Sequence, residues 1–549
     1  MTPILEHTTR MAVLPAYVAA AASAAFVVYL ALLAVYRLTF HPLAGYPGPF
    51  LAKTTPWRDV YHAWRGDKHL DFYELHQRYG PFVRYGPNTL SVNDPAALKA
   101  IYGHRANVRK SDFYLAFPAV PGAFSTHTAL DRHAHARKRR VMSHAFSDQA
   151  LKGVEDYVLG YVRAFVGKLT AATADGDGHG LGHGSAGGGG PDGWSPARDV
   201  AEWCTYLGFD VMGDLAFGKS FSMLEGDVPE NREAAFLLTQ AAKRHNITGP
   251  MPWLHQSGLD RLLFRKINQD RDRYLAFSRK QVGQRTQSDV WKSDRKDFFY
   301  YLLNSKDPET GEGFGKQELW GESNTLIIAG SDTTSTTLTG AIFYLLHNPA
   351  ALARLAAEIR TTFATSESIR SGPSLNGCVY LRACIDEALR LSPPVGAVLP
   401  RLTLPGGLDV CGRHIPPGIG VGCPIYALHH HADHVPDPFA YRPERWLAGE
   451  VEASGGDEGV RRLHDVFNPF SVGPRGCIGK PMAYLELSLA LARLVWAWDM
   501  RLAPGELGKV GAGAKGMGTG REREGEFQLE DIFVSNKVGP MAQFRPRQD

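Results

Sequence analysis

Apolar residues along most of the chain recur every three to four positions, as in amphipathic or buried helices. Helices are predicted on this basis over residues 198–217, over residues 316–348, and over the apolar run that follows Cys477. Residues 82–92 instead alternate around a Gly-Pro-Asn turn, which predicts a β-hairpin. The pattern therefore predicts long helices and at least one short pair of strands.

The most apolar stretch is residues 11–36, which contains no charged side chain. Because a helix of about 20 apolar residues spans a bilayer, we expect a transmembrane anchor here, after a short tail over residues 1–10. A cleaved secretory signal is the alternative, but the apolar region is too long, and Arg37, His41 and Pro42 do not form a small-residue cleavage site. The basic residues after the stretch favour a cytosolic position for the main domain.

Residues 37–50 are rich in proline and glycine, a composition that excludes a helix over the prolines. We interpret this segment as a stiff hinge between the anchor and one large domain over residues 51–549. Two stretches within that domain, residues 175–194 and 508–525, are so rich in glycine that we interpret them as surface insertions.

Composition excludes several classes of function. The chain has 549 residues, of which 44% are hydrophobic, so it can bury a large core. The net charge of +4 does not indicate nucleic-acid binding, and no recognition motif accompanies the basic run at residues 132–140. The six cysteines are scattered without paired spacing, which argues against a disulfide framework or a zinc site and favours a reducing compartment.

One cysteine stands apart because it lies in a glycine-rich turn just before an apolar helical run. The backbone N–H groups and the dipole at the start of a helix favour the thiolate of Cys477. A soft thiolate is a good axial ligand for heme iron. Gly473 and Gly479 let the backbone approach a flat macrocycle. Arg475 is placed to reach a heme propionate, and Phe470 to pack beside the sulfur. A buried, inert cysteine is the alternative.

The long helix predicted over residues 316–348 contains a segment that suits a helix poorly, Ala329-Gly330-Ser331-Asp332-Thr333-Thr334. Such a violation of local preference inside a long helix is often functional. Ala329 and Gly330 leave room for a small ligand, Thr333 can back-bond and hydrogen-bond dioxygen, and Asp332 can relay protons. A polar helix face with a packing glycine is the alternative.

A pair of opposite charges, Glu387 and Arg390, lies three residues apart on one helical face. Arg445 follows in a proline-containing segment and is a candidate third partner in a buried network that would be structural. The histidine-rich residues 429–434 invite a metal site, but no helix places these histidines on one face, so we favour a surface stretch.

Together these motifs resemble those of the cytochrome P450 family, and the resemblance covers nearly the whole chain from about residue 40. It implies a mainly α fold with a small β region, preceded by one N-terminal transmembrane helix. It also implies heme b, with the iron ligated axially by the Cys477 thiolate. The heme-contacting residues that it implies are Phe470, Gly473, Arg475, Gly479, Ala329, Gly330, Arg401, Arg139 and His135, the last in place of a more usual tryptophan.

The same resemblance implies a monooxygenase in which Asp332 and Thr333 assist oxygen activation, while Glu387, Arg390 and Arg445 form a structural triad. The expected partners are O2, a lipophilic small molecule and an NADPH-cytochrome P450 reductase. The expected location is the endoplasmic reticulum membrane, single-pass, with a cytosolic catalytic domain. Residues 110–114 and 135–147 resemble fungal members of specialised metabolism, whose substrates include terpenoids, polyketides and aromatic acids.

Two other functions are compatible with a heme-thiolate chain. One is an isomerase, dehydratase or peroxygenase that needs no reductase. The other is a non-enzymatic membrane heme sensor or carrier. The presence of both the acid Asp332 and the alcohol Thr333 disfavours both alternatives.

Overall fold

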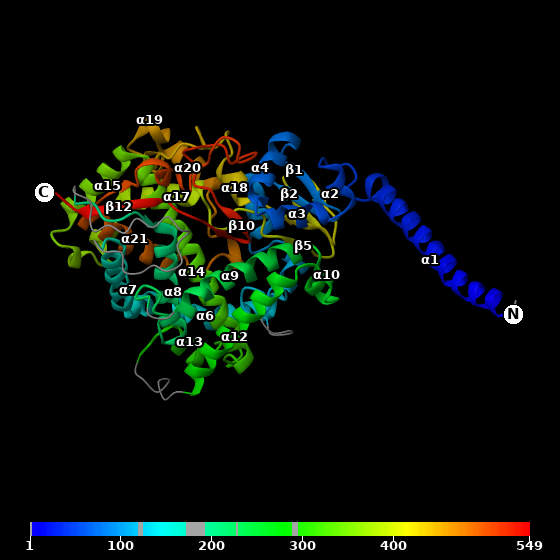
Figure 1. Ribbon diagram of the computed structural model, residues 1–549. Helices are drawn as coiled ribbons and strands as arrows, with labels where there is room; N and C mark the ends of the chain where they lie inside the picture. The colour runs from blue at the N-terminus through cyan, green and yellow to red at the C-terminus, as the bar shows by residue number, and fades with distance from the viewer. Residues whose placement is uncertain (1–2, 119–123, 172–192, 227–228, 288–294, 549) are drawn as a thin grey trace.

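The computed structural model describes residues 3–118, 124–171, 193–226, 229–287 and 295–548. As predicted, the protein is mainly helical with small sheets, and one long N-terminal helix projects from the body (Figure 1). The α-helices are α1 (Pro3–Val35), α2 (Phe50–Thr54), α3 (Trp57–Arg65), α4 (Lys68–Tyr79), α5 (Pro95–Tyr102), α6 (Arg132–Ser143), α7 (Asp148–Leu169), α8 (Val200–Phe217), α9 (Pro229–Thr248), α10 (Pro252–Gln256), α11 (Leu259–Leu263), α12 (Arg265–Gln287), α13 (Phe298–Asn304), α14 (Lys316–His347), α15 (Pro349–Thr362), α16 (Pro373–Asn376), α17 (Val379–Leu391), α18 (Ile425–His429), α19 (Val451–Ser454), α20 (Gly456–Val466) and α21 (Lys480–Ala497).

Short strands and helical turns complete the fold. The turns are η1 (Tyr36–Phe40), which is a π-helix, and the 3-10 helices η2 (Asp112–Ala116), η3 (His144–Phe146), η5 (Ser366–Ser368), η6 (Pro443–Trp446), η7 (Gly473–Arg475) and η8 (Gly505–Lys509). The strands are β1 (Phe82–Gly86), β2 (Thr89–Val92), β3 (Val108–Lys110), β4 (Arg198–Asp199), β5 (Arg401–Thr403), β6 (Leu408–Val410), β7 (Arg413–Ile415), β8 (Gly420–Gly422), β9 (Trp498–Leu502), β10 (Glu530–Ile532), β11 (Val534–Asn536) and β12 (Met541–Pro546).

The sheets lie beside the helices and connect distant parts of the chain. The largest has the strand order β1-β2-β8-β5-β3, in which only β2 and β8 are parallel. Its β1–β2 pair is the hairpin predicted from the alternating residues 82–92. The C-terminal strand β12 pairs with both β9 and β4, so the end of the chain is tied to two earlier segments.

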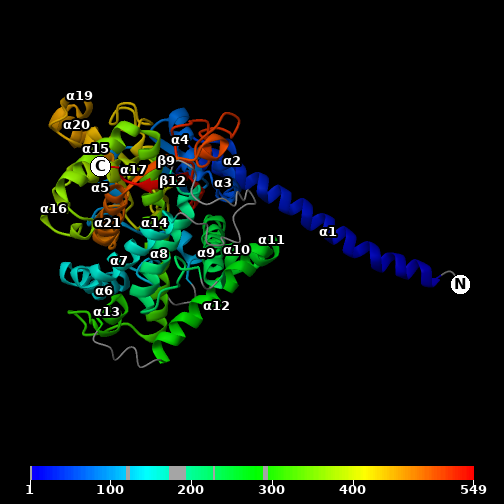
Figure 2. The same cartoon turned by 60° about the vertical axis from the view of Figure 1, so that its left-hand side comes forward.

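The N-terminal apolar stretch forms the long helix α1, which continues into η1. Tyr17–Phe40 is a candidate membrane span, because it contains an 18-residue window with a mean hydropathy of 2.4 that is not buried against the rest of the protein. The span lies within the continuous helical stretch formed by α1 and η1 and overlaps the predicted anchor over residues 11–36. Figures 1 and 2 both show α1 leading away from the body, which leaves its apolar surface free to meet lipid.

The proline-rich segment after α1 is irregular from His41, but it is held against the domain. Arg84, fully buried in β1, donates to Arg37 O at 2.8 Å and to Leu43 O at 3.3 Å. The His41 ring also meets the Asn88 amide, with 2.9 Å between Nε2 and Oδ1. These bonds fix the direction in which the chain leaves α1.

The centre of the fold is α14, which is buried along most of its length and packs against α8, α17 and α21. The crossing of α14 with α8 is close because both helices carry glycine there. A Cβ on Gly208 would lie 2.8 Å from Ser331 O, and a Cβ on Gly330 would lie 2.6 Å from Met212 Sδ. Helix packing therefore supplies a direct reason for Gly330 in the long helix.

Glu387 of α17 lies at the centre of a buried network. Its Oε1 accepts from Arg390 Nη2 at 2.8 Å and from Arg445 Nε at 3.0 Å, and its Oε2 accepts from Trp446 Nε1 at 2.9 Å. Burial alone would raise the pKa of Glu387, but Arg390 and Arg445 lower it below its usual value, so the carboxylate stays ionised.

The network continues to the cysteine loop through a histidine. His429 Nδ1 lies 3.1 Å from Arg390 O, and His429 Nε2 accepts from Asn468 N at 3.0 Å. Burial and then Arg390 lower the pKa of His429 to about 3, so the ring is neutral and bridges the two backbone segments. The prediction of a surface stretch over residues 429–434 is therefore wrong for His429 and His430, which are both fully buried. Among the described residues, no group of three or more His, Cys, Asp or Glu side chains is arranged to hold a metal ion. The six cysteines, all described, are free thiols.

The two predicted glycine-rich insertions have different outcomes. Residues 175–194 lie almost wholly outside the described residues. Residues 508–525 pack onto the domain, because Arg521 Nη2 donates to Gly66 O at 3.1 Å and Arg523 lies 3.6 Å from the centre of the Phe439 ring. This second segment is therefore a folded part of the surface.

The triad yields a stability prediction. Glu387→Ala would leave Arg390 and Arg445 buried without their counter-charge, so we expect the free energy of unfolding to fall by about 3–5 kcal/mol. Thermal unfolding followed by circular dichroism would measure the change. Glu458→Ala is the matched control, because Glu458 pairs with Arg461 on the exposed face of α20 and such a pair contributes at most about 0.5 kcal/mol. Equal melting temperatures for the two variants would contradict a structural role of the triad.

Candidate active site

The turn that carries Cys477 is fixed by backbone contacts. Cys477 N donates to Phe470 O at 2.8 Å, which closes the loop between η7 and the start of α21. Gly473 has a φ of +73°, and a Cβ there would lie 2.0 Å from Tyr102 O, so only glycine fits. Gly479 is different, because a Cβ would meet only Cys477 Sγ at 3.8 Å and Phe146 at 3.9 Å. Its small size therefore leaves open space beside the sulfur.

The Cys477 side chain is exposed, but the surface that it exposes belongs to an internal cavity surrounded by protein. Burial raises the pKa of the thiol above its usual value, while the N–H groups of Gly479 and Lys480 and the charge of Arg139 lower it. The N–H groups predicted from the sequence are thus present, but the effect of burial on the pKa of the thiol is larger than theirs. A metal cation bound to the sulfur would supply the remaining stabilisation of the thiolate.

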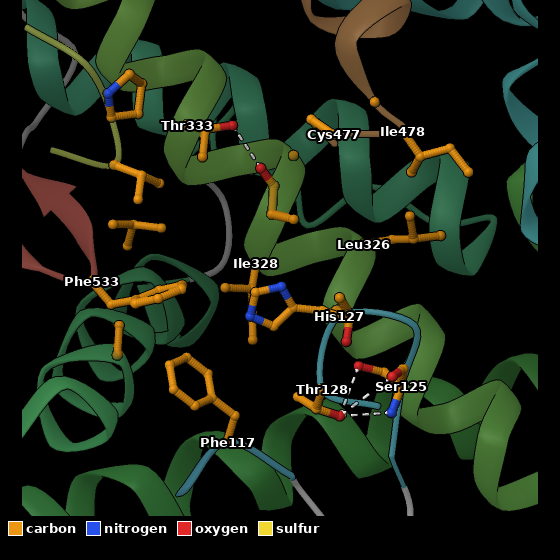
Figure 3. Close-up of a pocket in the computed structure, with 18 of the residues that line it drawn as sticks. Phe117, Ser125, His127, Thr128, Leu326, Ile328, Thr333, Cys477, Ile478 and Phe533 are labelled. Atoms are coloured by element: carbon orange, nitrogen blue, oxygen red, sulfur yellow. Dashed lines mark hydrogen bonds between the residues drawn. The ribbon is translucent and has the colours of Figure 1, made fainter. Parts of the chain in front are cut away.

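The cavity lies between the Cys477 loop and the middle of α14, and its volume is about 330 Å³. Ala329, Gly330 and Thr333 line the α14 wall, while Phe470, Arg475 and the thiol line the opposite one. Figure 3 shows Cys477 and Thr333 at one end of the cavity and Phe117 at the other, with Phe533 entering from the side. The motif on α14 and the cysteine loop before α21 are therefore brought face to face.

The acid and the alcohol on α14 have different environments. Thr333 Oγ1 faces the cavity and donates to Ala329 O at 2.7 Å. Asp332 is buried and does not line the cavity, and its Oδ2 has no hydrogen-bond partner among the described residues. Burial raises the pKa of Asp332 to about 6, and the charge of Lys537 opposes the shift. Asp332 is thus poised to exchange a proton near neutral pH from behind the cavity wall.

Three cations gather at one side of the cavity: Lys110, Arg401 and Arg475. None of them pairs with a carboxylate among the described residues; they bond to backbone oxygens, as when Arg475 Nη1 donates to Ala129 O at 2.6 Å. Burial and then Arg401 lower the pKa of Arg475 to about 10. Buried cations without counter-charges are costly, so this cluster is arranged for a ligand with anionic groups.

Comparison with known proteins decides the family. The model of the cytochrome P450 family matches residues 55–509. This chain belongs to the cytochrome P450 family. It is 40% identical to the cytochrome P450 monooxygenase apf7 of Gibberella fujikuroi over 95% of this chain and 97% of that protein. It is 39% identical to the cytochrome P450 monooxygenase AKT7 of Alternaria alternata over 98% of this chain and 100% of that protein. It is 38% identical to the cytochrome P450 monooxygenase atnE of Emericella nidulans over 94% of this chain and 94% of that protein.

The chain is therefore a heme-thiolate P450 monooxygenase, and its own residues fit the cofactor. Cys477 Sγ faces the cavity and would hold the heme iron, and the open space beside Gly479 would admit a flat ring. The two propionates of heme b match the cluster of Lys110, Arg401 and Arg475, which has no carboxylate of its own among the described residues.

Two residues predicted to contact the propionates lie farther back. Arg139 Nη1 donates to Gly476 O at 2.6 Å, and neither Arg139 nor His135 lines the cavity. Burial and then the nearby cations, Arg475 first, lower the pKa of His135 to about 3, so its ring is neutral. The structure places Arg139 as a support for the cysteine loop and His135 beside the cation cluster.

The basic run around α6 is largely neutralised within the protein. Arg137 and Lys138 both bind Glu318 at the start of α14, and Arg140 Nε donates to Asp307 Oδ1 at 2.5 Å. These pairs tie α6 to the segment before α14. Three of the basic side chains of this run, Arg137, Lys138 and Arg140, are therefore paired with acids of the protein itself.

Sequence reasoning missed several residues of the site. Lys110 of β3 begins the segment 110–114 that resembles fungal members of the family, but nothing in that segment indicates a heme contact, and His127 lies in a loop that no local pattern marks. Glu486, which follows Cys477 within the apolar helix α21, also lines the cavity. Burial raises the pKa of Glu486 to about 8, although a hydrogen bond with Thr334 opposes the shift, so this carboxyl is mostly protonated at pH 7. The signal for Glu486 in the sequence is that a single acidic residue stands in an otherwise apolar helical run.

The cation cluster predicts how heme is held. Lys110→Met removes one cation but keeps the side-chain length, so we expect heme affinity to fall roughly tenfold, the effect of one hydrogen bond to a charged group. Titration of the apoprotein with heme, followed by Soret absorbance, would measure it. Lys152→Met on the exposed face of α7 is the control and should bind heme as the parent does. Unchanged affinity in Lys110→Met would exclude Lys110 from the propionate site.

Proposed function

We propose that this P450 monooxygenase inserts one oxygen atom into a lipophilic small molecule, an intermediate of fungal specialised metabolism. The observation that carries the proposal is the cavity itself, because most side chains between Thr333 and Phe117 are apolar, among them Leu326, Ile328 and Phe533. The balanced reaction is RH + O2 + NADPH + H⁺ → ROH + H2O + NADP⁺. The fungal sources of the similar monooxygenases support the assignment to fungal metabolism.

The heme, when bound, supplies O2 activation and oxygen-atom transfer, and the protein supplies orientation and protons. Thr333 presents its hydroxyl to the cavity beside Ala329 and Gly330. Asp332 can take up and release a proton behind that wall near neutral pH, because its pKa is about 6. Lys537 is close enough to lower the pKa of Asp332, and its Nζ donates to Ser335 Oγ at 2.7 Å, one turn along α14. Asp332 and Thr333 therefore form the proton path in this proposal.

We also propose that electrons come from an NADPH-cytochrome P450 reductase at the endoplasmic reticulum membrane, with the catalytic domain in the cytosol. The candidate span Tyr17–Phe40 and the bonds from Arg84 to the segment after it support an anchored domain with a defined orientation. The basic residues that follow the span support the cytosolic side.

Reconstitution tests the proposed function directly. The purified full-length protein in lipid vesicles with a fungal P450 reductase, NADPH and a library of lipophilic compounds should give products 16 mass units heavier than the substrates. With ¹⁸O2 the added oxygen should be heavy. Products formed with peroxide alone, or rearranged products without added oxygen, would instead support a peroxygenase or an isomerase.

The proton path yields a prediction on a reacting substrate. Asp332→Asn removes the exchangeable proton, so we expect product formation to fall about 100-fold, with NADPH consumption falling less. Thr333→Val should lower the fraction of NADPH electrons that reach product. Thr337→Val is the control, because Thr337 lies one helical turn after Thr333 and also lines the cavity. Its hydroxyl likewise donates to the backbone of its own helix, to Thr333 O at 2.9 Å. If Asp332→Asn retained the parent's rate and coupling, Asp332 would have no part in proton delivery.

A further inference from the structure

The far end of the cavity carries a polar pair in otherwise apolar surroundings. His245 of α9 and Arg271 of α12 line the cavity beside Phe117, Ala242 and Leu275. The His245 and Phe117 ring centroids are 4.8 Å apart. Figure 3 places Phe117 at the opposite end of the cavity from Cys477, and Figure 2 shows α9 and α12 on the other side of α14 from α21. The pair is therefore remote from the sulfur.

Arg271 is a buried cation with incomplete pairing. It is 8% exposed, and its Nε has no hydrogen-bond partner among the described residues. Its Nη1 donates to Asp272 Oδ1 at 3.1 Å, but the Asp272 side chain is 53% exposed, so solvent screens that charge. His245 presents a second unpartnered group, because its buried Nε2 has no partner within the described ranges.

The acids near Arg271 in the sequence form no buried ion pair with it among the described residues. Asp260 binds the neighbouring Arg244, with 2.5 Å between Oδ2 and Nη2. Arg244 also donates to Asn268 Oδ1 at 2.7 Å, so this second buried arginine is well satisfied. Asp270 is buried, approaches Arg273 only at 3.9 Å through Oδ1, and its Oδ2 has no hydrogen-bond partner among the described residues. Arg271 is thus left with a buried positive charge that the described side chains only partly balance.

A buried guanidinium costs free energy unless an anion completes its hydrogen bonds. Burial and then Arg244 lower the pKa of Arg271 to about 10, so it remains charged at pH 7. Burial and then Arg244 and Arg271 hold the pKa of His245 well below its usual value, so that ring is neutral. One positive charge with a planar fork of donors matches one carboxylate in charge and geometry.

We propose that Arg271, with His245 beside it, binds the carboxylate of an amphipathic carboxylic acid whose apolar body extends through the cavity toward Thr333 and Cys477. The inference rests on the proposed monooxygenase function and deepens it by naming the substrate class. It also sets the regiochemistry, because an acid held at the far end presents a carbon remote from its carboxylate to the oxidising end. The apolar walls at Leu326, Ile328 and Phe533 suit such a chain.

Ligand titration of the heme-loaded full-length protein tests the anchor. The probes are dodecanoic acid, dodecan-1-ol, methyl dodecanoate and dodecyl phosphate, and the readouts are the Soret shift and calorimetry. We expect the acid to bind at least tenfold more tightly than the alcohol or the ester. If the unmodified protein binds dodecanoic acid and dodecan-1-ol with equal affinity, the proposal is overturned by that result alone. Tighter binding of the phosphate would assign the site to phosphates and overturn it as well.

Variants then locate the effect. Arg271→Gln should weaken binding of the acid at least tenfold and binding of the alcohol less than threefold. Arg273→Gln is the matched control, because Arg273 lies two residues along the same helix with its side chain 57% exposed, and it should bind both probes as the parent does. Arg271→Lys keeps the charge without the fork and should bind the acid with intermediate affinity. Unchanged acid binding in Arg271→Gln would contradict the anchor.

Failure of the anchor and failure of the proposed function give different results. If the parent oxygenates a lipophilic compound in an NADPH- and reductase-dependent reaction but shows no preference for acids, only the anchor is wrong. If the acid binds through Arg271 but no compound is oxygenated, the carboxylate site stands and the monooxygenase assignment on which its role depends is wrong.

Discussion

The structure depends on the position of one sulfur atom, which must face the middle of a buried helix across a cavity. Cys477 is held there by its own loop, in which Gly473 passes so close to Tyr102 that no side chain fits. Behind the loop, the Glu387 network reaches Asn468 through the neutral ring of His429. Much of the buried polarity of this half of the fold thus serves to fix one turn of backbone.

The opposite wall is fixed by packing. Close approach of α8 and α14 at Gly208 and Gly330 sets where Thr333 stands relative to the sulfur. The charged groups lie in three separate places. The cations that have no carboxylate partner among the described residues lie at the side of the cavity that suits the propionates, Asp332 lies behind the α14 wall near Lys537, and Arg271 lies at the far end. The remaining surface is mostly apolar, so each charged group in the cavity has a separate place and a separate role.

The sequence predicts those features that short segments encode. The cysteine turn, the long helix with its poor helical centre and the Glu387–Arg390 pair are local patterns, and the structure contains each of these elements. The anchor and the β1–β2 hairpin are equally local: a candidate membrane span overlaps the predicted anchor, and the hairpin is present. Contacts between distant segments are not encoded this way. Lys110, His127 and Lys537 reach the site only through folding. The packing role of Gly330 depends on Met212 of another helix. Residues 508–525 are held by a contact at Gly66 that their composition does not reveal.

The most direct test of the account is the reduced carbon monoxide difference spectrum of the full-length protein, recorded beside that of Cys477→Ala. We expect a strongly red-shifted Soret band in the parent and its loss in a variant that remains folded, because the thiolate gives the iron that electronic character. A folded, heme-loaded parent without the band, or a variant that keeps it, would show that Cys477 is not the ligand and would contradict the account.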